Sequence, residues 1–199
     1  MMNSLRWSWR WLLLPCLTLS RGLHAQALAP SGTGVSFAVA GLGGLMRTDI
    51  TGAMASTTAH APRLEASFGA TPRLGVLAAW SPQAVTIDGE RFTIANLELG
   101  LRYTGRVGRV WRPFADVGMA RRGFRYDTPL VIRATTLSPW AAAGLVRRGS
   151  GHLGVELALT AAPSTFDQFT VDDVIQTLQA VHTRFMGARA GLRYWVHHR

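Results

Sequence analysis

The sequence predicts an all-β fold, an eight-stranded antiparallel up-and-down β-barrel. Five segments alternate apolar and polar residues for about ten positions each, which is the period-two pattern of a strand with one buried face. In the clearest segment Leu97, Leu99 and Leu101 share one face, and Glu98 and Arg102 share the other. The connections are by turns short and long, as in a barrel built from successive hairpins.

The first four predicted strands occupy residues 34–46, 63–70, 73–81 and the segment that ends near Tyr103. In each, every second side chain is apolar, so one face of the strand can be buried. The four apolar faces are Val35, Phe37 and Val39; Leu64, Ala66 and Phe68; Leu74, Val76, Ala78 and Trp80; and Leu97, Leu99, Leu101 and Tyr103.

The last four predicted strands occupy residues 110–120, 138–147, 153–159 and 184–196. Three have clear apolar faces, whereas the alanine-rich sixth strand does not define its own register. The three faces are Trp111, Pro113, Ala115, Val117 and Met119; Leu153, Val155, Leu157 and Leu159; and Ala188, Ala190, Leu192, Tyr194 and Val196.

Turn residues and polar stretches separate these strands. Glycine, proline and serine near residues 71, 106 and 149 predict short turns. Long loops are predicted over residues 47–62, 82–90, 121–136 and 161–183. In the last loop, Thr170 and Asp173 resemble a capping box, and Val171, Val174, Ile175, Leu178 and Val181 follow at helical spacing, which predicts a loop helix.

Residues 1–27 have the organisation of an export signal. Two arginines precede an apolar run over residues 11–19, and Ala25-Gln26-Ala27 is a small-residue cleavage site. The run is shorter than the ~20 residues of a membrane-spanning helix. We therefore expect a cleaved signal peptide and a single mature domain over residues 28–199.

Composition narrows the partners of the mature chain. Its one cysteine, Cys16, lies in the signal, so no disulfide is expected. The net charge of the full chain, +10, comes from arginine, because the chain contains no lysine; loss of Arg6, Arg10 and Arg21 with the signal would leave +7. These arginines are scattered over strands and loops, which favours anionic lipid over nucleic acid as the partner.

Aromatic residues indicate which side of the barrel faces lipid. Trp80, Tyr103, Trp111 and Tyr194 belong to the apolar faces and lie at predicted strand ends, where membrane barrels carry aromatic girdles. The barrel is therefore predicted to span a membrane with short periplasmic turns and long external loops. A soluble lipocalin-like barrel has the same alternation with its two sides exchanged.

The opposite faces carry charged side chains that a transmembrane barrel must place inside. An eight-stranded barrel is only just wide enough for its own side chains, so these charges must pair. The sequence thus predicts a packed polar interior, not an open pore. Its members are Glu65, Glu98, Arg102, Asp116, Glu156, Arg189 and Arg193.

The chain resembles the small eight-stranded outer-membrane barrels of the OmpA and OmpX type. Trp111-Arg112-Pro113-Phe114 is similar to the start of a middle strand in that family, and Gly191-Leu192-Arg193-Tyr194-Trp195 is similar to its last strand. The resemblance covers residues 34–196. It implies a monomer in the Gram-negative cell outer membrane, in contact with outer-membrane lipid, lipopolysaccharide and the assembly machinery.

No catalytic or cofactor constellation is evident in the sequence. His152 follows Ser150 at a predicted periplasmic turn, and His60 and His182 have no serine partner, so an enzyme is not predicted. The tandem His197-His198 lacks further ligands, and neither a metal nor a cofactor is expected. Arg121, Arg122, Arg125 and Arg133 share one predicted external loop and are candidates for contacting lipopolysaccharide phosphates.

The sequence therefore predicts a non-enzymatic outer-membrane barrel with a structural, adhesive or surface-interaction role. Two alternatives stay open at this point. One is a soluble periplasmic barrel that binds a small apolar ligand, and the other is an outer-membrane lipid-modifying enzyme.

Overall fold

The computed structural model describes residues 33–50, 53–87, 90–105, 110–126, 131–149, 151–172 and 174–196. These residues form eight strands and no helix. The predicted signal peptide and the histidine pair lie outside the described residues. The strands are β1 (Gly34–Ile50), β2 (Ala53–Gly69), β3 (Leu74–Ile87), β4 (Glu90–Thr104), β5 (Trp111–Tyr126), β6 (Ile132–Arg148), β7 (Leu153–Val171) and β8 (Val174–Trp195).

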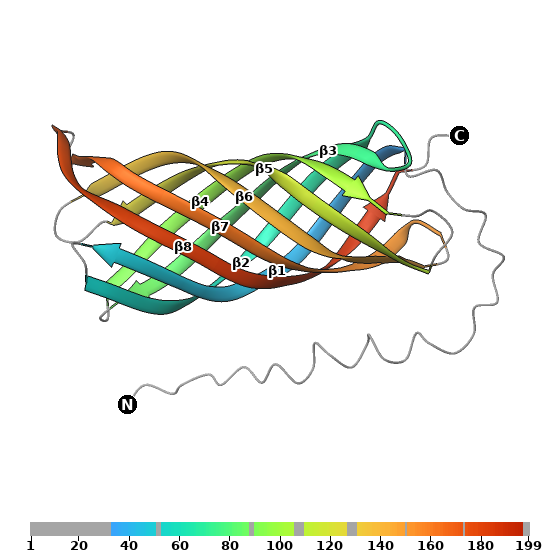
Figure 1. Ribbon diagram of the computed structural model, residues 1–199, viewed down its shortest axis with the longest axis horizontal. Helices are drawn as coiled ribbons and strands as arrows, with labels where there is room; N and C mark the ends of the chain where they lie inside the picture. Colours follow the sequence, from blue (N-terminus) through green and yellow to red (C-terminus); the bar gives the residue numbers. More distant parts are fainter. Residues whose placement is uncertain are drawn as a thin grey trace, which may run out of the picture.

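The strands close into one barrel, as the alternating sequence predicts. Each strand pairs antiparallel with its neighbour in the chain, and β8 pairs with β1 (Figure 1). We name the end that holds Gly34 and Trp195 the terminal end, and the end at which β1 passes to β2 and β7 to β8 the distal end. The β7–β8 hairpin extends furthest at the distal end (Figure 1).

The register sets the tilt of the strands. A path of paired residues that starts at Leu45 of β1 runs through β8, β7 and the remaining strands around the barrel. It returns to β1 at Val35, ten residues before its start. With about 3.3 Å per residue and 4.8 Å between strands, this offset gives a tilt of about 40° to the barrel axis, within the usual range for barrels.

The predicted long loops are wrong, because the strands continue through most of their residues. β1 ends at Ile50 and β2 begins at Ala53, so most of the expected 47–62 loop is paired strand. β3 and β4, β5 and β6, and β7 and β8 likewise extend at the distal end. Serine, threonine and arginine on the outer face of these extensions interrupt the apolar alternation, which is why the sequence pattern ended too early.

The predicted loop helix is also wrong. Val171 pairs with Val174, and Thr170 with Ile175, so this segment is the tip of the β7–β8 hairpin. Asp172 has a left-handed backbone with φ of 46°, which allows the tight turn. A register shift sets one β7 residue, Asp167, opposite three β8 residues, 178–180, so the period-two alternation of β8 is interrupted within the segment that mimicked a helix.

Two glycines on neighbouring strands leave room for a large side chain inside the barrel. Gly100 and Gly118 face each other across β4 and β5. A Cβ on Gly118 would lie 2.0 Å from the carbonyl oxygen of Leu99, and one on Gly100 would lie 2.8 Å from the Trp140 ring. The two glycines thus let Trp140 lie buried across the lumen.

No helix in the described part of the chain is long and apolar enough to cross a membrane.

Candidate functional site

Charged side chains from five strands meet inside the half of the barrel near the terminal end. All seven residues that the sequence assigned to the interior are at most 8% exposed. The structure joins them, together with Arg63, into one network of ion pairs. The network therefore contains four carboxylates and four guanidinium groups, so its charges balance.

Asp116 on β5 is the most buried member, with no exposed surface. Arg102 on β4 binds it through two parallel hydrogen bonds, Nε to Oδ1 at 2.7 Å and Nη2 to Oδ2 at 2.8 Å. Arg189 on β8 donates from Nη2 to Oδ2 at 2.6 Å. Phe114 lies beneath both arginines, with its ring centre 4.4 Å from the Arg102 guanidinium carbon and 5.4 Å from that of Arg189.

Glu156 on β7 connects three arginines. Its Oε2 accepts hydrogen bonds from Arg193 Nη2 at 2.6 Å and from Arg102 Nη1 at 3.1 Å, and its Oε1 lies 2.8 Å from Arg189 Nη2. Glu65 on β2 pairs with Arg102 and with Arg193. Each of these carboxylates therefore contacts more than one guanidinium group, which compensates for its removal from water.

Arg63 on β2 is the member that sequence reasoning missed. It pairs with Glu98 and lies 3.3 Å from Glu65. Because the predicted strand began at Arg63, this residue was treated as a strand end. Its position two residues before Glu65 places it on the same face of β2, so the alternation itself carried the signal.

The network leaves little free space in the barrel. The cavity enclosed among Arg63, Glu65, Glu156 and Arg189 has a volume of about 10 Å³, which is about the smallest space that holds one water. A larger depression of about 70 Å³ opens at the terminal end, beside Arg102, Arg193 and Trp195. The charged side chains thus fill this part of the lumen.

The interior toward the distal end combines apolar clusters with polar side chains such as Gln83, Asn96 and the buried Arg122. Trp140 lies at the boundary, with the Arg63 guanidinium carbon 5.5 Å from its ring centre. Beyond it lies a cluster that includes Leu42, Met46, Val85, Ile94 and Phe185. Aromatic rings follow. Phe92 is stacked with Phe124 and Tyr126 at 5.4 Å and 5.0 Å between ring centres, and the Phe166 ring is tilted by 55° against Phe124 at 6.3 Å.

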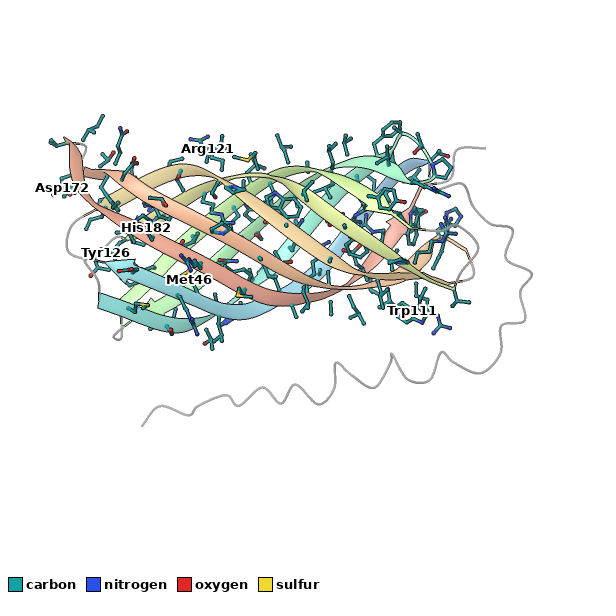
Figure 2. The ribbon with its side chains drawn as sticks, in the orientation of Figure 1. Met46, Trp111, Arg121, Tyr126, Asp172 and His182 are labelled. Carbon is teal, nitrogen blue, oxygen red and sulfur yellow. The ribbon has the colours of Figure 1, made fainter. Side chains whose placement is uncertain are left out.

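The outer surface shows the reverse arrangement, because large apolar side chains cover it. Leu99, Val117, Leu159 and Met186 are between 56% and 71% exposed. Tyr103, Trp111 and Tyr194 also point outward, and all three lie near the terminal end. Figure 2 shows Trp111 on the outside of the barrel at that end.

Trp80 does not share the level of these three aromatic residues. It points outward as predicted, but β3 continues to Ile87, so Trp80 lies mid-strand and not at a strand end. Its outward neighbours across the strand pairs are Leu64 and Leu97. The girdle at the terminal end therefore contains Tyr103, Trp111 and Tyr194 without Trp80.

The four arginines assigned to one external loop lie on two neighbouring strands. Three of them point outward and one points into the lumen. Arg121, Arg125 and Arg133 point outward near the distal end, and Arg125 is paired with Arg133 across β5 and β6. Figure 2 shows Arg121 on the outer surface. Arg122 instead lies inside, 7% exposed, and donates from Nη1 to Ser164 Oγ at 2.6 Å. Its assignment as a lipid contact is wrong, because strand alternation turns it inward.

These outward arginines and the aromatic residues border an apolar band. On β5, Arg121 and Trp111 are ten residues apart, with only apolar outward residues between them. On β8, Arg184 and Tyr194 are also ten residues apart and enclose Met186 and Leu192. Ten residues of a strand tilted by about 40° span about 25 Å along the axis, which matches the apolar band of outer-membrane barrels.

His182 has a hydroxyl partner that the sequence did not reveal. Thr165 on β7 lies beside it on the outer face, with Oγ1 3.0 Å from Nδ1 of the imidazole. Asp49 on β1 is the paired residue on the other side of His182. Because residues 161–183 were predicted to form a loop, no strand register was available to place His182 beside Thr165 and Asp49.

The fold is similar to solved outer-membrane proteins. Neisserial surface protein A matches with a TM-score of 0.57 and 12% identity, covering 82% of this chain and 99% of that one. OprG from Pseudomonas aeruginosa matches with a TM-score of 0.56 and 13% identity, covering 83% and 98%. The outer membrane protein AlkL in lipid bilayers matches with a TM-score of 0.57 and 13% identity, covering 89% and 98%.

The chain therefore has the fold of the small eight-stranded outer-membrane barrels. At these identities the likeness establishes the fold and nothing beyond it. No protein-family model and no curated protein matches the sequence.

Proposed function

We propose that this protein is a non-enzymatic integral outer-membrane barrel with a structural, adhesive or surface-interaction role. The observation that carries the proposal is the distribution of side chains, with paired charges inside and an apolar band of about 25 Å outside. A soluble barrel needs the opposite distribution, so the lipocalin-like alternative is disfavoured. We further propose export through a cleaved signal peptide over residues 1–27.

The proposed orientation of the barrel in the membrane rests on two features, the end at which β1 begins and β8 ends and the arginines at the other end. The terminal end faces the periplasm, where membrane barrels place their chain ends and short turns, and the distal end faces outward. There the Arg121, Arg125 and Arg133 side chains lie at the edge of the apolar band. We propose that they contact lipopolysaccharide phosphates, because guanidinium groups bind phosphate oxygens in pairs. The barrel is a monomer that meets the assembly machinery during insertion.

The interior supports a closed barrel and not a conducting pore. Asp116, Glu156 and their arginine partners occupy the cross-section near the terminal end. Purified protein reconstituted in a planar bilayer is expected to show no steady conductance. A regular open state that disappears in a barrel unfolded by boiling would contradict the closed interior.

Membrane integration is tested by electrophoresis of the detergent-extracted membrane fraction with and without boiling. A closed transmembrane barrel stays folded in detergent until it is heated, so the expected result is a heat-dependent change of mobility. Protein that appears in the periplasmic extract without detergent would contradict the proposal.

The non-enzymatic role has its own test, because His182 and Thr165 lie on the outer face within reach of lipid. Lipid A and phospholipids from cells that express the protein are expected to carry the same acyl chains as those from cells without it. An acyl-chain change that the His182→Ala variant abolishes would show lipid-modifying activity and overturn this part of the proposal.

A further inference from the structure

A second pair of outward arginines lies on the opposite part of the distal rim, at the seam where the barrel closes. Arg47 of β1 and Arg184 of β8 are paired residues, and both side chains are exposed. No acidic partner is found for either among the described residues. Like charges directly opposite each other on a sheet are destabilising, so this arrangement suits an anion bound between them.

Below this pair the outer surface is hollowed. A shallow, open groove of about 510 Å³ crosses β1, β8, β7 and β6, with Gly41, Ala188 and Ala190 as its small residues and Leu157 and Leu159 at its side. The residues between the arginines and the groove, such as Met186, are apolar. The groove thus lies below the charged pair along the same strand seam, with the outward side chains of Met186 and Leu45 between them.

Two glycines of the groove region are not required by the packing of the barrel. A Cβ added to Gly41 or Gly43 would meet no atom within 4 Å, whereas one added to Gly44 would lie 2.3 Å from a backbone oxygen. Glycine within a strand lowers its stability, because it has no side chain to pack. Of these two glycines, Gly41 lines the groove and contributes to the hollow.

The dimensions fit one lipid leaflet. Arg184 and Ala190 are six residues apart on β8, which corresponds to about 15 Å along the barrel axis at a tilt of about 40°. Half of the apolar band of about 25 Å is about 12–13 Å, so Ala190 lies close to the middle of the band. A phosphate held by the arginines would thus place an acyl chain in the groove.

Polar side chains lie next to the Arg47–Arg184 pair on its distal side. His182, Thr165 and Asp49 form the next outward row toward the distal end. Thr165 Oγ1 lies 3.0 Å from Nδ1 of the His182 imidazole. This polar row is consistent with a lipid headgroup at the height of the Arg47–Arg184 pair.

We propose that the seam between β1 and β8 is a binding site for one phosphorylated, acylated lipid, with the phosphate between Arg47 and Arg184 and an acyl chain in the groove beside Gly41. The lipid is lipid A of the outer leaflet, since the site lies at the distal end. The proposal rests on the proposed outer-membrane orientation, but it concerns residues that the closed barrel does not need.

The test uses native mass spectrometry of the processed barrel extracted from membranes, titrated with diphosphorylated lipid A or with phosphatidylglycerol. The Arg47→Ala/Arg184→Ala double variant is expected to bind lipid A at least about tenfold more weakly, as charge-assisted hydrogen bonds are lost. Gly41→Leu fills the groove and is expected to weaken binding about fourfold or more, which corresponds to contact with about one methylene group.

Matched variants keep the test specific. Arg73→Ala/Arg147→Ala removes two outward arginines at the terminal end, and Gly123→Leu adds an outward leucine on β5. Both are expected to bind lipid A as the wild type does. All variants are expected to keep the heat-dependent mobility of the folded barrel, so loss of that property would signal failure of the proposed membrane barrel and not of this site.

Three results would overturn the proposal. Equal binding of phosphatidylglycerol with the same sensitivity to the variants would show a general anion site. Weaker binding in the double arginine variant without any effect of Gly41→Leu would show a phosphate site without the groove. Unchanged lipid A binding in both variants would show that the seam binds no such lipid.

Discussion

The two halves of the barrel interior are held together by different forces. Near the terminal end, buried carboxylates and arginines fill the lumen through ion pairs. Toward the distal end, aliphatic and aromatic side chains fill much of the lumen through contact area, beside polar side chains such as Asn96 and Arg122. The first arrangement depends on every partner being present, because one unpaired charge is costly there. The second loses stability in proportion to the volume removed. The predictions below test this contrast.

The largest effect is expected from Asp116→Ala. This change removes Asp116, one of the two carboxylates that Arg102 and Arg189 share, deep inside the barrel. The free energy of unfolding should fall by about 3–5 kcal/mol, the usual result of breaking a buried ion pair. Urea unfolding of the barrel in phospholipid vesicles measures it. Ser138→Ala in the distal half is the control, with an expected loss of about 1 kcal/mol. Equal losses in the two variants would contradict the contrast.

Phe166→Ala should have a somewhat smaller effect in the distal half. The ring is 3% exposed and packs against Phe124. Its removal is expected to cost about 3 kcal/mol, at the lower end of the range for a buried phenylalanine, because the site is near the barrel mouth. Phe166→Leu keeps most of the volume and should cost less than half as much in the same unfolding experiment. A leucine variant as unstable as the alanine variant would argue against simple loss of contact area.

Leu99→Arg sharpens the comparison between inside and outside. Leu99 is 62% exposed and lies near the middle of the apolar band. An arginine at the midplane of a bilayer costs about 2–4 kcal/mol, falling to about 0–1 kcal/mol near the interface. Thr135→Arg, on the outer face near the distal rim, is the matched variant. If both substitutions are equally tolerated in bilayers, the outer surface does not face hydrocarbon.

The smallest effect is expected at the β7–β8 tip. Asp172 has a positive φ, and its Oδ1 accepts a hydrogen bond of 3.2 Å from the Val131 backbone nitrogen. Asp172→Ala should lower stability by about 1 kcal/mol, whereas Asp172→Asn should change it little, because asparagine tolerates this backbone and can still accept the bond. Hydrogen exchange of the hairpin amides would detect the change locally. Faster exchange in the barrel centre would contradict a local role.

Alternation predicted the inward and outward faces because each spanning segment has one apolar face. It placed Glu65 and Asp116 on the face opposite Leu64 and Val117, and the structure has the same arrangement. The strand ends were not predictable in this way, since beyond the apolar band both faces carry polar residues. This is also why Arg122 was grouped with Arg121.

Long-range pairing was the other quantity hidden from the sequence. Arg47 and Arg184 are adjacent only because β8 closes against β1. The same closure brings Asp49 beside His182. A period within one strand gives the facing of its side chains but not the register to a distant strand.

Fluorescence quenching by lipids with brominated acyl chains tests the central claim most directly. Two variants of the processed barrel would each retain one tryptophan, either Trp80 on the outer face or Trp140 in the lumen. In reconstituted bilayers the account predicts strong quenching of Trp80 and little quenching of Trp140. Strong quenching of Trp140 with Trp80 unaffected would show that the faces are exchanged, and would contradict a barrel with a charged interior and a lipid-facing surface.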